Sequence, residues 1–157
     1  MDLDKLLEKY QVELDTLVFD DFTNETALKI GLHIIEVAKK NNNKITIDIN
    51  RFNHQIFHYS FENTTPDKDL WVSRKRNVVE HFFVSSIYMA TKLKKDNTNL
   101  WDKYGLSPAQ YAAVGGSFPI IVKNIGVIGS ITVSGLKPEE DHGLVVTSIR
   151  NYLNTAH

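Results

Sequence analysis

The most restrictive feature of the sequence is a glycine-rich segment near its C-terminal end, residues 115–135. It contains Gly-Gly-Ser-Phe-Pro-Ile-Ile-Val at 115–122 and Val-Ile-Gly-Ser-Ile-Thr-Val-Ser-Gly at 127–135. The Lys-Asn-Ile-Gly between these runs predicts a tight turn, so we expect a β-hairpin. Glycine inside a strand is unfavourable unless a ligand or another backbone comes close, or the strand bulges. Gly115, Gly116 and Gly129 therefore indicate a site or a tightly packed surface.

Composition limits the classes of protein to which the chain can belong. Its 157 residues, 42% hydrophobic and 24% charged, are typical of one globular domain. A formal net charge of −1 gives no general attraction to nucleic acid or anionic lipid, and we expect neither as a partner. The absence of cysteine excludes disulfides, thiolate catalysis and cysteine-containing zinc sites. The charged N-terminus and the lack of an apolar run of about 18 residues predict a cytoplasmic protein.

Hydrophobic periodicity and capping signals predict the order of the elements. We expect helices over 3–17 and 23–40, strands over 45–50 and 55–61, and a helix beginning at 66. A further helix begins near 85 or 86 and ends within 92–97, followed by a short helical turn within 100–108, a strand over 111–115, the glycine-rich hairpin and a helix over 138–154. In residues 45–50, isoleucine alternates with polar residues, which predicts a half-buried strand. Hairpins rather than βαβ crossovers indicate an α+β fold, with helices on a central antiparallel sheet of about five strands.

Several motifs resemble those of the haem-degrading-domain family, also called HbpS-like or GlcG-like. They are Gly-Gly-x-x-Pro-Ile at 115–120, Ile-Gly-x-Ile-x-Val-Ser-Gly at 128–135 and the Glu-Asp pair at 140–141. A cytosolic branch shared by bacteria and fungi is more similar still. It also shows Trp-x-x-Arg-Lys-Arg at 71–76, Phe-x-x-Ser-Ser-x-Tyr-Met at 82–89 and Ser-Gly-Leu-Lys-x-Glu-Glu-Asp-His at 134–142. The resemblance covers about residues 23–155.

The resemblance implies a profilin-like α/β/α sandwich and a homo-oligomer. It also makes haem the candidate cofactor, because some relatives bind it. We expect one domain over residues 1–157, made of an N-terminal helix and connector over 1–22 and a haem-degrading-like core over 23–155.

Ser134, Asp141 and His142 together resemble a Ser-His-Asp set. Adjacent residues on a helix diverge by about 100°, however, so Asp141 is poorly placed to orient the ring of His142 toward a common serine. No Gly-x-Ser-x-Gly motif surrounds Ser134. The other interpretation of the acidic residues is that they complement the positive end of the helix dipole. We therefore predict no catalytic residues.

Histidines and carboxylates provide weak candidates for metal binding. His142 with Asp141 or Glu140 could supply two ligands, to which a partner subunit could add others, and His54 and His58 could share a strand face. None of these has the spacing of a known metal motif. We predict no metal site.

Residues 74–76, Arg-Lys-Arg, form the densest basic patch. Consecutive helical positions point in different directions, so these side chains cannot form one stripe for a nucleic-acid backbone. One interpretation is a solvated face or intersubunit salt bridges. The alternative is that an arginine, Arg74, faces the hairpin glycines and binds a carboxylate or a propionate.

Aromatic side chains at helical spacing either form core or line a pocket for a flat ligand. The residues concerned are Trp71, Phe82, Phe83, Tyr88, Trp101, Tyr104 and Tyr111.

Our leading hypothesis is a cytosolic, self-assembling domain that binds a small anionic or planar ligand such as haem. The alternative is a protein-interaction module without ligand chemistry, and an enzyme ranks third. The candidate ligand-binding residues are Arg74, Gly115, Gly116, Gly129, Ser134, Asp141 and His142.

Overall fold

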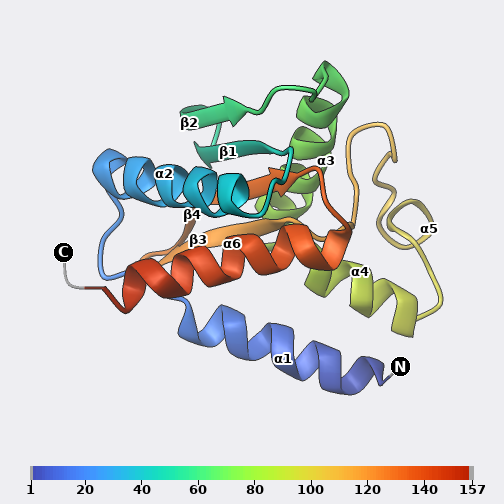
Figure 1. The fold of residues 1–157 in the computed structure, drawn as a ribbon. Helices are drawn as coiled ribbons and strands as arrows, with labels where there is room; N and C mark the ends of the chain where they lie inside the picture. The colour runs from blue at the N-terminus through green and yellow to red at the C-terminus, as the bar shows by residue number, and fades with distance from the viewer. Residues whose placement is uncertain (1, 156–157) are drawn as a thin grey trace.

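A computed structural model gives the structure of the protein and describes residues 2–155. The helices are α1 (Leu3–Thr16), α2 (Asn24–Lys40), α3 (Pro66–Phe82), α4 (Ser86–Lys95), α5 (Leu100–Tyr104) and α6 (Pro138–Leu153). The strands are β1 (Thr46–Arg51), β2 (His54–Ser60), β3 (Ser117–Val122) and β4 (Gly126–Ser134). Helices α2 and α6 lie in front of the sheet in Figure 1 and α3 lies behind it, which confirms the α/β/α sandwich.

The strands form one antiparallel sheet in the order β2-β1-β4-β3. The described residues thus contain four strands rather than about five, because 111–115 is not a strand. The outer edge of β3, where another strand could add, is already occupied by Phe19. Its N–H donates to the Ile121 carbonyl at 2.8 Å, and its carbonyl accepts from the N–H of Lys123 at 2.8 Å. Residues 111–115 pack against α3 instead, where the Ala112 N–H donates to the Arg74 carbonyl at 3.1 Å.

Local sequence sets the helix boundaries largely as predicted. Thr23 caps α2, with its Oγ1 accepting from the Thr26 N–H at 3.2 Å. Ser85 caps α4 in the same way. Pro66 stands in the first turn of α3, where the missing N–H costs nothing.

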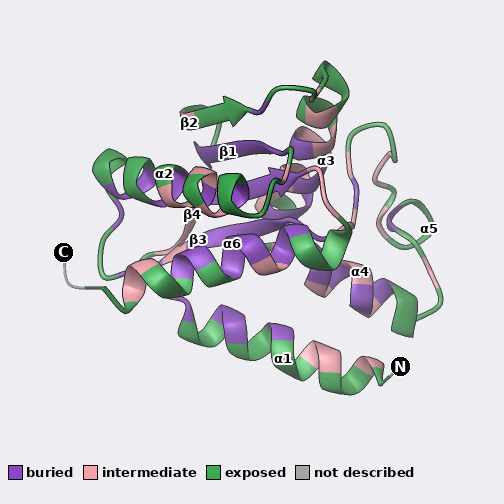
Figure 2. Cartoon of the chain, viewed as in Figure 1, coloured by how far each residue is buried: buried purple, intermediate pink, exposed green. Residues whose placement is uncertain are grey.

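The face of the sheet toward α2 and α6 is apolar and carries the main core. Its buried residues are Ile45, just before β1, and the strand residues Ile47, Ile49, Phe118, Ile120, Ile131 and Val133. Helix α2 adds Ile30 and Ile34, and α6 adds Val145 and Ile149. Figure 2 shows β1, β3 and β4 buried between the helices.

The opposite face is polar, yet on β1, β4 and the start of β3 it is equally buried. The polar side chains there are at most 4% exposed: Thr46, Asp48, Asn50, Ser117, Ser130, Thr132 and Ser134. The prediction of a half-buried strand over 45–50 is therefore wrong, because α3 covers the polar side. Hydrogen bonds across the sheet make this burial tolerable, such as the 2.8 Å contact between Ser117 Oγ and Thr132 Oγ1.

The predicted hairpin is present, and its glycines are explained by close packing within the chain. A Cβ on Gly129 would collide with the carbonyl oxygen of Asn50 and lie 2.9 Å from the Cα of Arg51, both on β1. A Cβ on Gly115 would collide with the Pro138 carbonyl oxygen. The glycines therefore allow backbones to approach one another.

Gly129→Val should destabilise the protein although valine favours strands. The added side chain would press on the backbone of β1, which cannot rotate out of the way as a side chain can. We expect a loss of about 1–3 kcal/mol in the free energy of unfolding, measured by thermal and urea melts. A melting temperature equal to or above that of the wild type would contradict the close approach.

Candidate functional site

Lys75 lies at the centre of a cluster that gathers three of the seven candidate residues, Gly116, Ser134 and Asp141. It projects from α3 into the polar layer and is only 2% exposed. Its Nζ donates to Asp141 Oδ2 at 3.0 Å and to the Val133 carbonyl at 3.1 Å. One buried ammonium group thus connects α3, the end of β4 and the start of α6.

Asp141 uses both of its carboxylate oxygens. While Oδ2 accepts from Lys75, Oδ1 accepts from the Leu136 N–H at 2.9 Å, which fixes the turn between β4 and α6. Burial raises the pKa of Asp141, and the Lys75 charge opposes this shift. Burial likewise lowers the pKa of Lys75, with Asp141 opposing it. Each charge therefore depends on the other for its stability in this dry setting.

Gly116 and Ser134 lie against the same cluster. Gly116 has a φ of +136°, and a Cβ there would stand 2.7 Å from Lys75 Nζ. Ser134 ends β4 and lines a hollow of about 270 Å³ together with Lys75, Gly135 and Asp141. This volume is below the roughly 300–1,000 Å³ typical of ligand pockets.

Lys75→Met should cost about 3–5 kcal/mol in the free energy of unfolding, since Asp141 would keep a buried, unpaired charge. The double variant Lys75→Met, Asp141→Asn should recover most of that loss, because asparagine is neutral and still accepts from Leu136. Urea melts of the single and double variants measure this coupling. Equal losses in both would contradict a mutually dependent pair.

His142 belongs to a different environment from its neighbour Asp141. Its Nε2 lies 2.7 Å from Glu13 Oε1 of α1, and it is 4% exposed. The Tyr10 ring meets the imidazole edge-on at 5.2 Å, and Phe118 lies on a further side. The structure thus separates Asp141 and His142, as their divergence on a helix predicts, and closes the histidine beneath α1.

Arg74 and Gly129 do not join the Lys75 cluster. The Arg74 guanidinium stacks over Trp71 at 4.4 Å, and its Nε donates to the Pro108 carbonyl at 3.0 Å. Gly129 packs against β1, as described above. Of the basic residues 74–76, the one that faces the glycines is Lys75. Its position between Trp71 and Val78 on the apolar side of α3 is the sequence signal for its burial.

A second group of charges lies between α3 and β1, where Asp48 is buried and Arg76 and Glu80 are partly buried. Arg76 Nη1 approaches Asp48 Oδ1 at 3.5 Å, and its Nε lies 3.9 Å from Glu80 Oε1. Within residues 2–155, neither of these carboxylate oxygens receives a hydrogen bond. Burial raises the pKa of Asp48, and burial together with the Asp48 charge raises the pKa of Glu80. The nearby guanidinium of Arg76 opposes both shifts.

Stability should therefore fall as the pH rises from the ordinary carboxyl range through the raised pKa of Glu80. A raised pKa in the folded state means that the native protein binds the proton more tightly than the unfolded chain does, so unfolding releases it. Glu80→Gln should make this pH dependence shallower, as measured by urea melts from pH 4 to pH 8. The exposed Glu36→Gln is the matched control. An unchanged profile in Glu80→Gln would contradict the coupling.

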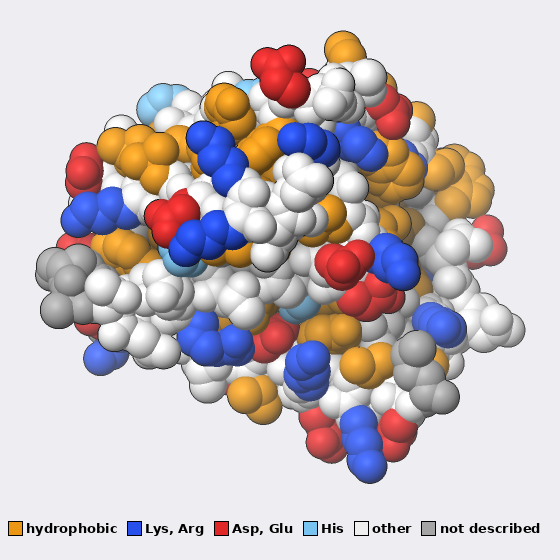
Figure 3. Space-filling view, in the orientation of Figure 1, with side chains coloured by type: hydrophobic (Ala, Val, Ile, Leu, Met, Phe, Trp, Pro, Cys, Tyr) orange, Lys and Arg blue, Asp and Glu red, His pale blue; other side chains and the backbone are white. Residues whose placement is uncertain are grey.

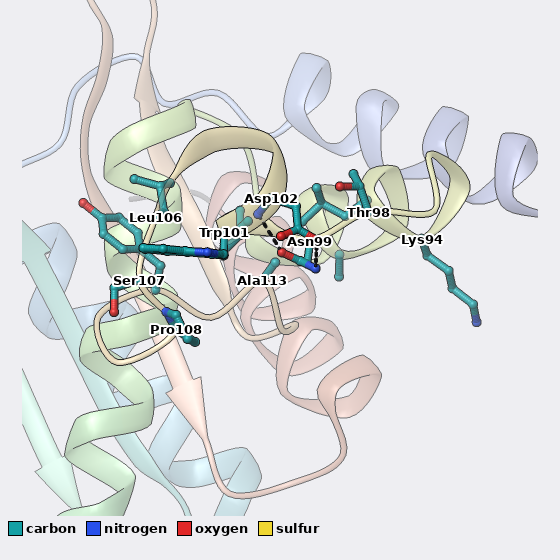
Figure 4. A pocket seen from close by; sticks show the side chains of 13 residues that line it. Lys94, Thr98, Asn99, Trp101, Asp102, Leu106, Ser107, Pro108 and Ala113 are labelled. Carbon is teal, nitrogen blue, oxygen red and sulfur yellow. Dashed lines mark hydrogen bonds between the residues drawn. The ribbon is translucent and has the colours of Figure 1, made fainter.

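A large hollow lies away from both charge clusters, between α4, α5 and the loop over 105–113. Its volume is about 840 Å³. The lining residues are mostly apolar or small: Ala90, Leu93, Lys94, Thr98, Asn99, Leu100, Trp101, Asp102, Leu106, Ser107, Pro108, Tyr111 and Ala113. Figure 4 shows the Trp101 ring beside Leu106 and Ser107, while Lys94 extends away from the cavity.

The wall of this cavity is fixed although it lacks regular structure. Helix α3 binds it through Arg74 at Pro108, through the Asn77 Nδ2 that donates to the Gln110 carbonyl at 2.8 Å, and through Ala112. Arg74 therefore holds the loop that forms the cavity wall but does not itself line the cavity. Of the aromatic residues weighed from the sequence, Trp101 and Tyr111 line the cavity, whereas Phe82 and Tyr104 pack against the apolar cluster around Leu93 and Leu100.

Comparison with known proteins identifies the family. Residues 22–150 match the family described as haem degrading protein HbpS-like. The chain belongs to this family. A UPF0303 protein of Sinorhizobium medicae is 41% identical over 157 residues, 100% of this chain and 96% of that protein. A UPF0303 protein of Streptomyces coelicolor is 39% identical over 87% of each chain.

Solved structures of similar proteins confirm the fold. The Ybr137w protein has a TM-score of 0.87 at 29% identity, covering 94% of this chain and 87% of that one. HbpS has a TM-score of 0.65 at 18% identity, covering 85% of this chain and 91% of that one. A PduOC:heme complex has a TM-score of 0.69 at 13% identity, covering 88% and 98%. The last two likenesses concern the fold alone.

Proposed function

We propose that this member of the HbpS-like family binds a small planar ligand in the cavity between α4, α5 and the loop over 105–113. The observation that carries the proposal is the cavity itself, whose volume of about 840 Å³ suits a ligand-binding pocket. The indole of Trp101 is 60% exposed there and offers a flat surface for stacking. Haem is the candidate because of the family and because a protein of this fold has been solved as a haem complex.

The cavity suits a porphyrin ring better than it suits the iron. No histidine, cysteine or methionine is among the residues that line it, and Tyr111 is the one lining side chain of a common haem-ligand type. His142 pairs with Glu13 beneath α1. The chain would therefore hold the ring by stacking and apolar contact. Bound haem would place its iron at the site, while contacts with the porphyrin ring would supply the free energy of binding.

We further propose that the role is binding, in the cytoplasm, rather than catalysis. The two side chains that most resemble catalytic groups are occupied by other parts of the chain. Asp141 receives hydrogen bonds from Lys75 and Leu136, and His142 contacts Glu13. Among the described residues, no helix is long and apolar enough to cross a membrane.

Trp101→Ala should weaken porphyrin binding about tenfold, because the ring loses its stacking surface. Titrations with haemin and with metal-free protoporphyrin IX, followed by absorbance and fluorescence, measure this. The two compounds should bind with similar affinity, since the iron receives no strong ligand. Haemin should show only a small Soret shift, and His142→Ala should leave it unchanged.

Trp71→Phe serves as the control, since Trp71 packs under Arg74 outside the cavity. A sharp low-spin haemin spectrum abolished by His142→Ala would overturn this assignment and move the site under α1. If neither porphyrin binds, a planar-ligand role is wrong. Affinity equal to wild type in Trp101→Ala would also be contrary to the proposal.

A second candidate function is assembly with further copies of the same chain. Exposed apolar side chains on α2 and around β2 favour it, including Leu28 at 41%, Leu32 at 52% and Tyr59 at 42% exposure. The glycine-rich hairpin is not part of this surface, because its glycines pack against the chain's own backbone. Self-assembly and ligand binding use separate parts of the molecule and are compatible.

A further inference from the structure

The two edges of the sheet differ in whether another segment of the chain covers them. Phe19 covers the edge of β3 through two backbone hydrogen bonds. Strand β2 forms the other edge, and no further strand of the described chain pairs with it, although the first turn of α3 rises beside its end in Figure 1. Uncovered edges invite pairing with another chain, so proteins usually protect them.

The sequence of β2, His-Gln-Ile-Phe-His-Tyr-Ser, lacks the residues that usually protect an edge, although its pairing with β1 shifts register between Ile49 and Asn50. It contains no lysine, no proline and no acidic residue. The Phe61 N–H donates to the Ile45 carbonyl on β1, so by the antiparallel alternation the backbone groups of His58 and Ser60 point to the open edge. Both residues are exposed. The edge is therefore free to accept a strand.

Helix α2 extends the apolar surface beside this edge. At about 100° per residue, Leu28, Leu32 and Ile35 fall on one side of the helix, next to the buried side. They lie on the same flank as Gly31, where an added Cβ would collide with the Phe57 ring of β2. The stripe formed by Leu28, Leu32 and Ile35 thus points past β2 toward solvent. Figure 3 shows apolar side chains exposed over this part of the molecule.

The ends of the stripe carry opposite charges. Glu25 lies at the N-terminal end of α2 and Lys39 at the C-terminal end, on the same side as Leu32. Both are exposed, and neither forms an ion pair within the described part of the chain. Residues 25 and 39 are equally far from residue 32. A stripe of this kind is complementary to an antiparallel copy of itself.

We propose that two copies of the chain pair their β2 edges antiparallel about a two-fold axis, with the α2 stripes packed across that axis. Leu32 meets the partner's Leu32, and Glu25 meets the partner's Lys39. The surface fits this occupant in spacing as well as in charge. Helix α2 contacts both β1 and β2. With strands about 4.8 Å apart, two such helices lie about 10 Å apart, which is a normal packing distance.

This proposal rests on the self-assembly proposed above and specifies its surface. It is independent of the cavity between α4 and α5, to which neither α2 nor β2 contributes a residue. The sheet of the pair would be continuous, with the open edge of each copy closed by the other.

Light scattering coupled to size exclusion, at micromolar concentration, should report an even number of subunits for the wild type. Leu32→Glu places like charges at the axis and should weaken the pairing at least about 100-fold. Val12→Glu, which makes the same kind of change at a 57% exposed position on α1, should leave the assembly intact. Porphyrin titrations should be unchanged by Leu32→Glu.

Charge reversal gives the sharper test. Glu25→Lys and Lys39→Glu should each weaken the pairing about tenfold, because every single change affects two symmetric contacts. The double reversal should restore the pairing. It should also lower the melting temperature, because both charges then oppose the helix dipole. A merely structural role of these charges would not give this combination.

The outcomes separate the two proposals. A monomeric wild type overturns both self-assembly and this interface. An assembly that persists unchanged in Leu32→Glu overturns the interface while leaving self-assembly intact. An assembly that neither single reversal weakens, or that the double reversal does not restore, overturns the antiparallel arrangement.

Discussion

The buried contact between Lys75 and Asp141 connects the three layers of the fold. One ammonium group joins a helix behind the sheet to the end of a central strand and to the first turn of a helix in front. Taking two charges out of water is expensive, and the cost is repaid only when geometry and additional hydrogen bonds are good. The Leu136 N–H and the Val133 carbonyl supply those additional bonds. The tight approach of Gly116 beside the ammonium follows from the same requirement.

The polar layer beneath α3 restricts how this helix can lie on the sheet. An apolar interface tolerates small slides of a helix, whereas charged and hydrogen-bonded side chains need particular partners. Arg76 at Asp48 and Lys75 at Asp141 therefore fix both the rotation and the position of α3 along the sheet. Because α3 also binds the loop over 107–112, the position of α3 sets the position of the wall of the large cavity.

The sequence predicts the helices and the hairpin well because their signals are local. Thr23, Pro66 and Ser85 mark helix starts by capping chemistry, and alternating isoleucines mark β1. Residues 111–115, predicted as a strand, could not be recognised as a loop from the sequence. Whether they can join the sheet depends on Phe19, far away in the chain, which occupies the edge of β3.

The candidate site was predicted less completely, for the same physical reason. Glycines and acidic residues indicated that backbones meet near Gly116 and Asp141, but their partner, Lys75, resembles a solvated residue within a basic triplet. Its position between Trp71 and Val78 indicates the buried side of α3, but its partner Asp141 becomes evident only when that side is set against the polar sheet face. The cavity likewise depends on how α5 and the loop after it fold back, which no local spacing encodes.

The covering of His142 by α1 has a consequence for comparing members of the family. The family match begins at residue 22, after α1, whereas Glu13 and Tyr10 of α1 enclose the imidazole. In this chain, access to Nε2 of His142 is thus controlled by α1 rather than by the segment that matches the family. Chemistry measured at this histidine would apply to a homologue only if that homologue carries both the histidine and an equivalent helix over it.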